Sequence, residues 1–122
     1  MHIVERVITL DEFRAERFEP FAGPPFGASV LMKNQMSHYV VLDLVGALMG
    51  SESHELVVRA KRLIENGERT IVINLKSVTT VDEWGLGELI GCYMNIVGSG
   101  GAILLANPPS QFCQFIAKAK FL

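Results

Sequence analysis

A chain of 122 residues, 49% of them hydrophobic and 20% charged, has the size and balance of one globular domain and is too apolar to be intrinsically disordered. The formal net charge is −2 with both signs mixed along the chain, which leaves no basic stripe of the kind that nucleic-acid binders carry. Two cysteines do not make a secreted disulfide scaffold, the N-terminus lacks the pattern of a signal peptide, and no apolar run reaches the roughly 18 residues of a membrane span. We therefore expect a cytoplasmic protein that does not insert into membranes.

The first 27 residues are predicted to be an N-terminal extension and linker. Thr9 and Glu12 have the spacing of a capping box, which favours a short helix after them. Residues 20–27, PFAGPPFG, end any helix because proline and glycine interrupt its hydrogen bonding. The extension either packs against a sheet edge or reaches a second subunit.

Residues 28–122 are predicted to form one domain in which strands alternate with helices. Four apolar runs are typical of strands: 28–33, 39–45, 70–75 and 102–106. The first two flank a short turn and should form an antiparallel hairpin, whereas the last three alternate with helical patterns and should pair in parallel. A loop is predicted over 46–50 and a polar loop over 76–81.

Three helices fill the intervals between and after these strands. The first is predicted to begin at Ser51 and end at Asn66-Gly67, and the second to begin at Asp82 and end in the glycine-rich stretch 98–101. The third follows residues 107–110. The order β-β-α-β-α-β-α predicts an α/β fold with a mixed, mostly parallel four-stranded sheet and packed helices.

Three segments of this region resemble the STAS family, named for sulfate transporters and anti-sigma-factor antagonists. They are VLDLVG at 41–46, the run TIVINL at 70–75 followed by VDxxGLGxL at 81–89, and GGAILLA at 100–106. Their order and spacing are similar to those of the family. The resemblance implies the STAS fold, in a bacterial signalling protein that regulates transcription.

The resemblance also implies a function and a site. In anti-sigma-factor antagonists the central motif reads Asp-Ser-Ser-Gly-Leu-Gly, or the same with Thr, and its first hydroxyl residue is phosphorylated by an anti-sigma factor kinase. The present chain matches the motif at Asp82, Gly85, Leu86 and Gly87. It has Glu83 at the acceptor position and Trp84 after it. Residues 82–87 are therefore predicted to be a partner-binding and switch loop.

Physical chemistry gives this loop two interpretations. A helix N-terminus favours anions, so a carboxylate at Glu83 is stable there, and Asp82 is a good capping residue. Both residues also fit a helix start without any function. Trp84 is either an interface anchor or a lid on the core, and Gly85 and Gly87 permit close approach of the sheet or of a partner. If the protein is phosphorylated, the nearby hydroxyls are the expected sites: Ser77, Thr79 and Thr80.

No side chains in the sequence combine into a visible catalytic or metal site, so we predict no enzyme, no cofactor and no metal. His38 and His54 lack a second ligand at metal spacing, and Cys92 and Cys113 are expected to be buried free thiols. The leading hypothesis is a non-catalytic regulatory module that binds an anti-sigma factor kinase or another STAS protein. The sequence leaves open whether the protein forms a homodimer. The alternatives are a STAS subunit of a lipid-transport ABC complex and a small-molecule or nucleotide-binding domain.

Overall fold

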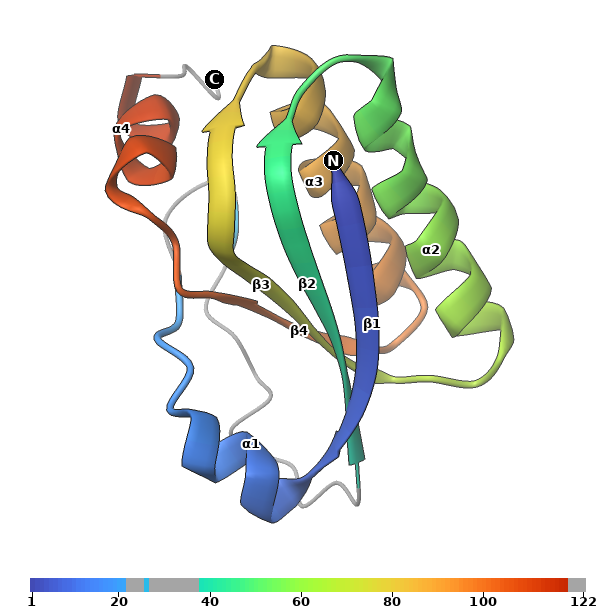
Figure 1. Ribbon diagram of the computed structural model, residues 1–122. Helices are drawn as coiled ribbons and strands as arrows, with labels where there is room; N and C mark the ends of the chain where they lie inside the picture. Colours follow the sequence, from blue (N-terminus) through green and yellow to red (C-terminus); the bar gives the residue numbers. More distant parts are fainter. Residues whose placement is uncertain (22–25, 27–37, 119–122) are drawn as a thin grey trace.

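The computed structural model describes residues 1–21, 26 and 38–118, and these contain a four-stranded sheet of order β1-β2-β3-β4 (Figure 1). The strands are β1 (His2–Thr9), β2 (His38–Leu48), β3 (Thr70–Val81) and β4 (Ala102–Ala106). β1 is antiparallel to β2, whereas β2, β3 and β4 run parallel. The mixed, mostly parallel sheet that the sequence predicts is therefore confirmed.

Three helices pack against one face of this sheet, here called the inner face. α2 (His54–Glu65), preceded by the short turn η2 (Ser51–Ser53), lies beside α3 (Glu83–Gly98), and α4 (Ser110–Lys118) lies at the β3 side (Figure 1). α1 (Leu10–Glu16) lies on the opposite, outer face at the lower end of the sheet. None of the helices in the described residues is long and apolar enough to span a membrane.

The pleat of β2 explains why both faces carry an apolar cluster. Successive strand side chains point to opposite faces, so Val40 and Leu42 join the inner core with α2 and α3, while Tyr39 and Val41 join a smaller outer cluster. Phe13 of α1 belongs to that outer cluster and stacks on Tyr39 with ring centroids 4.3 Å apart. A continuous apolar strand such as β2 is typical of a sheet that is covered on both sides.

The antiparallel edge of the sheet is formed by the N-terminal segment. The predicted strand 28–33, its turn and the hairpin that it would form lie outside the described residues. β1 pairs with β2 from His2↔Val45 to Thr9↔His38, so this segment packs against the sheet edge, one of the two arrangements that the sequence leaves open. The predicted capping box follows directly, since Glu12 N–H donates to Thr9 Oγ1 and Thr9 N–H donates to Glu12 Oε1.

The loops predicted over 46–50 and 76–81 are wrong for most of their length. β2 continues to Leu48 and β3 to Val81, and the two ends pair through two register shifts. Val78 is buried in the inner core while its neighbours Ser77 and Thr79 are exposed. This pattern is typical of a strand with one solvent-exposed face. The polar residues on that face are the reason why the sequence predicts a loop here.

Candidate partner-binding surface

The predicted switch loop lies where the ends of β2 and β3 meet the first turn of α3. Asp82, directly after β3, is the N-cap residue of α3: its Oδ1 accepts a hydrogen bond from Gly85 N–H at 2.7 Å. Its other carboxylate oxygen accepts a bond from Gly50 N–H at 3.0 Å. One side chain therefore fixes both the start of α3 and the connection between β2 and η2, which confirms the predicted cap and adds a second bond.

Gly85 is the position where α3 touches the sheet. A Cβ atom added there would lie 1.8 Å from the carbonyl oxygen of Leu48, far inside van der Waals contact. The predicted close approach is therefore present at Gly85, and the next residue, Leu86, is buried in the inner core. Gly87 differs, because a Cβ there would meet nothing within 4 Å.

Glu83 and Trp84 form the exposed first turn of α3. The side chain of Trp84 is 65% exposed, so it does not act as a lid on the core. Met49, which follows the Leu48 carbonyl, is 43% exposed and accepts a hydrogen bond at Sδ from the Thr80 hydroxyl. We call these four residues, Thr80, Met49, Glu83 and Trp84, the Trp84 surface.

The three hydroxyl residues predicted as phosphorylation sites lie on β3 rather than in a loop. Ser77 pairs with Val45 and Thr80 with Ala47 in the β2–β3 ladder, and Thr79 lies between them. All three are exposed. Phosphorylation at these positions stays a prediction, and the expected sites lie on a strand that is paired with β2.

The two histidines that the sequence analysis weighed as metal ligands each lie next to a glutamate. His38 Nε2 lies 2.9 Å from Glu68 Oε2, and His54 Nδ1 lies 3.1 Å from Glu88 Oε2. In the described part of the chain, no group of three or more His, Cys, Asp or Glu side chains could hold a metal ion. Burial raises the pKa of the Cys92 thiol to about 12, which disfavours the reactive thiolate.

Sequence reasoning missed two parts of the site, Met49 and Gly50. Both fall in a segment predicted as a loop, and the Gly50–Asp82 hydrogen bond joins residues 32 positions apart. No local pattern encodes such a contact. The exposure of Met49 and its place next to the end of β2 are likewise known only from the structure, so the sequence held no signal for them.

Comparison with known proteins places this geometry in a family. The model of the STAS domain matches residues 30–122, and the chain belongs to the STAS family. Among solved structures it is similar to the anti-sigma factor antagonist SpoIIAA in its unphosphorylated form, with 22% sequence identity, a TM-score of 0.54, and coverage of 66% of this chain and 74% of that chain. At this identity the likeness shows the fold.

Other comparisons add little. The structure titled Mglu in its native form matches 58% of this chain and 21% of that chain at 21% identity, with a TM-score of 0.44 that is too low to show a shared fold. None of the curated proteins compared with the chain matches it.

Proposed function

We propose that this protein is a non-catalytic regulatory module of the anti-sigma-factor-antagonist type that binds a protein partner through the Trp84 surface. The observation that carries the proposal is the 65% exposure of Trp84 on a first helical turn that Asp82 and Gly85 hold in place. Tryptophan is enriched among the residues that dominate binding energy at interfaces. A large exposed aromatic side chain on a fixed backbone is therefore a ready anchor.

The partner that we propose is an anti-sigma factor kinase or another STAS protein in the cytoplasm. In the anti-sigma-factor antagonists of this family, the motif position that Glu83 occupies carries the phosphorylated Ser or Thr. Glu83 is exposed at the N-terminus of α3, where the helix dipole favours a negative charge. A fixed carboxylate at this position resembles the phosphorylated form in sign of charge, although phosphoserine carries roughly −1.5 to −2.

A binding experiment with matched variants tests the proposal. Immobilised wild-type protein is incubated with lysate of the source cells, captured proteins are identified by mass spectrometry, and affinity for the purified partner is measured by titration calorimetry. Trp84→Ala should weaken binding by about 2 kcal/mol or more. Met94→Ala is the control, because Met94 lies on the same helix and is equally exposed, at 65%.

The result has two clear readings. Loss of affinity in Trp84→Ala with unchanged affinity in Met94→Ala supports the Trp84 surface. Equal affinity of wild type and Trp84→Ala contradicts it. The identity of the captured protein then separates an anti-sigma kinase from a transport ATPase.

A further inference from the structure

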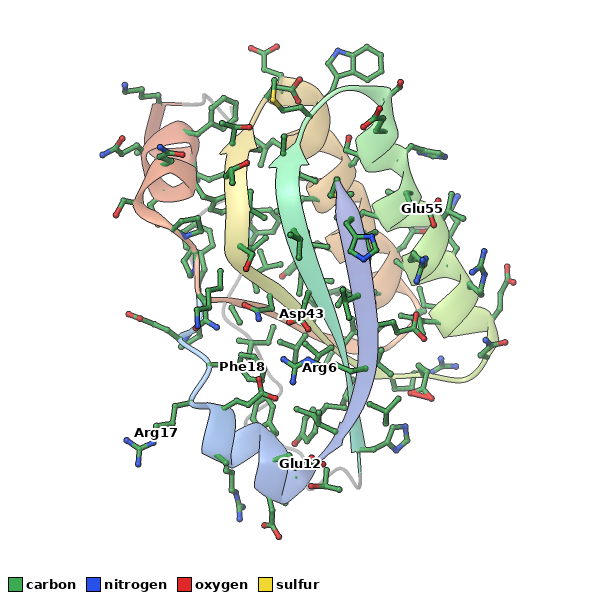
Figure 2. All side chains as sticks on the ribbon, in the orientation of Figure 1. Arg6, Glu12, Arg17, Phe18, Asp43 and Glu55 are labelled. Carbon is green, nitrogen blue, oxygen red and sulfur yellow. The ribbon has the colours of Figure 1, made fainter. Side chains whose placement is uncertain are left out.

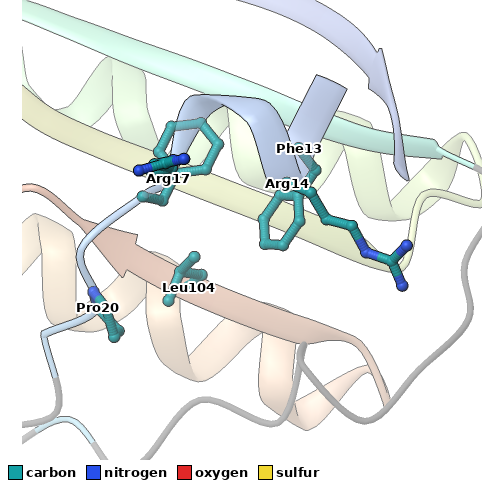
Figure 3. Close-up of a pocket in the computed structure, with 6 residues that line it drawn as sticks. Phe13, Arg14, Arg17, Pro20 and Leu104 are labelled. Carbon is teal, nitrogen blue, oxygen red and sulfur yellow. The ribbon is translucent and has the colours of Figure 1, made fainter. Parts of the chain in front are cut away.

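A second feature is a pocket of about 200 Å³ between α1 and the outer face of β4 (Figure 3). α1 lies at the other end of the molecule from the start of α3, where the Trp84 surface lies (Figure 1). Its floor is apolar and its rim is cationic. The lining residues are Phe13, Arg14, Arg17, Phe18, Pro20 and Leu104. Figure 3 shows the Arg17 side chain above Leu104 and the Arg14 side chain extending outward on the opposite side, away from Leu104.

The walls of this pocket are fixed by contacts on each side. Phe13 is buried against Tyr39 of β2, and Phe18 lies 5.6 Å from Phe13 between ring centroids. The segment after α1 is tied to β4, since Pro20 forms a bridge with Ala106 and Phe21 N–H donates to the Leu105 carbonyl at 2.8 Å. A hollow that is bounded by anchored elements is pre-formed, as small-molecule pockets usually are.

The positive charge at the rim is not neutralised by the described residues. Neither Arg14 nor Arg17 forms an ion pair with them, and the nearby Glu16 already accepts bonds from Arg6 at both carboxylate oxygens. The C-terminus of α1 contributes at most about half a negative charge. Two guanidinium charges outweigh that, so the rim attracts anions.

We propose that this pocket binds a small organic acid with an apolar body, such as an arylalkanoate or a medium-chain carboxylate. The body lies on Phe13, Phe18 and Leu104, and the carboxylate pairs with the guanidinium groups, which bind carboxylates with two parallel hydrogen bonds. The volume is below the roughly 300–1,000 Å³ typical of drug-sized ligands, which selects a compact acid. Such a ligand would contact both α1 and β4, and its binding would make the domain responsive to the presence of a metabolite.

The test uses 4-phenylbutyrate and octanoate, each paired with its neutral primary amide. Titration calorimetry should give a Kd on the order of 0.1–1 mM for the acids, and amide NMR shifts should fall on α1, residues 17–21 and β4. Arg14→Gln and Arg17→Gln should each weaken binding about tenfold, the effect of one charge-assisted hydrogen bond. Arg62→Gln is the control, because it removes the same charge from an exposed position on α2.

Four results would overturn the proposal: no binding of either acid up to about 10 mM, equal binding of acid and amide, unchanged affinity in both arginine variants, or NMR shifts confined to other elements. Since Arg14 and Arg17 are exposed, their variants should fold, and thermal unfolding of each variant verifies this. The pocket does not include the Trp84 surface, so failure here leaves the proposed partner binding intact.

Discussion

Arg6 of β1 and Asp43 of β2 form an ion pair on the outer face of the sheet, with Nε and Oδ2 2.7 Å apart (Figure 2). The pair is part of a polar row that crosses β1, β2 and β3 and ends at the residue after β4. Asn74 of β3 donates to Asp43 Oδ1 at 2.7 Å, and Asn107, directly after β4, donates to Asn74 Oδ1 at 3.1 Å. Arg6 also binds Glu16 of α1. The carboxylates of Glu16 and Asp43 raise the pKa of the Arg6 guanidinium above its ordinary value.

The first prediction is that Asp43→Ala destabilises the fold by about 1–3 kcal/mol. The substitution removes the charge-assisted hydrogen bonds that Arg6 and Asn74 donate to the Asp43 carboxylate at a half-buried site. Urea unfolding measures the change. Glu55→Ala is the control: it removes a carboxylate from the solvent-facing i,i+4 pair with Arg59, and should change stability by at most about 0.5 kcal/mol. Equal effects of the two substitutions would show that the polar row does not stabilise the sheet.

This row shows how far sequence reasoning reaches. Asp43 and Asn74 each interrupt an apolar run that predicts a buried strand, and the structure has strands there. A polar residue in such a run indicates a partner on a neighbouring strand. Arg6, the charged partner of Asp43, is not predictable in the same way, because the pattern of β1 does not predict a strand. Its pattern, HIVERVIT, mixes charges and β-branched residues, as a half-exposed edge strand does.

The candidate site was predictable to a similar degree. The cap at Asp82 and the close approach at Gly85 follow from local residue types at a helix start, and both are present. The exposure of Trp84 could not be derived, because a tryptophan in the first turn of a helix points to the core or to solvent depending on how the helix docks. That docking is set by the contact of Gly85 with Leu48, which no local pattern contains.

The second prediction concerns the two glycines of the motif. Gly85→Ala should destabilise the protein by about 3 kcal/mol or more, because its Cβ would lie 1.8 Å from the Leu48 carbonyl oxygen and α3 must shift away from the sheet. Gly87→Ala meets open space inside the same helix and should stabilise it by about 0.5–1 kcal/mol. Chemical unfolding of both variants provides the comparison. A Gly85→Ala protein as stable as wild type would refute the close docking of α3 on β2.

The third prediction is a pH dependence at the capping box. The backbone N–H of Thr9, followed by its side chain, stabilises the charged form of Glu12 and lowers the pKa of that carboxyl below 4.5. A group with a lowered pKa contributes stability that is present above its unfolded pKa and is lost as pH falls through the folded value. The stability difference between wild type and Glu12→Gln should therefore be constant near neutral pH and shrink below about pH 4.5.

Unfolding measured by urea from pH 7 to pH 3, together with NMR titration of Glu12, tests this. Glu65→Gln is the control, because it removes an exposed carboxylate at the end of α2 that forms no side-chain hydrogen bond with the described residues. If the difference for Glu12→Gln grows as the pH falls, the sign of the linkage is wrong and the capping box does not act through the charged carboxylate.

The fourth prediction concerns Glu83, and it rests on the proposed function. We expect Glu83→Ser to tighten binding to an anti-sigma kinase by about 1 kcal/mol, the scale of one charge at a helix terminus, and to create a phosphorylation site next to Asp82. The fold should persist, because position 83 is exposed and serine is accepted at helix starts. Calorimetry with the purified kinase measures the affinity, and a radiolabelled phosphate assay with mass spectrometry locates any phosphate.

The wild-type protein is the internal reference, because Glu83 has no hydroxyl that a kinase could phosphorylate. Any phosphate on the wild-type protein is expected at Ser77, Thr79 or Thr80. Glu65→Ser is the matched control, since it makes the same exchange at the far end of α2 and should leave affinity and phosphorylation unchanged. The opposite result, weaker binding of Glu83→Ser without phosphate transfer, would mean that Glu83 contacts its partner directly and that Glu83 and Trp84 together recognise a different class of protein. Asp82 and Gly85 hold the start of α3 in the wild-type protein and in Glu83→Ser alike, so α3 should have the same placement in both proteins. A measured change in affinity can therefore be assigned to the loss of the Glu83 carboxylate.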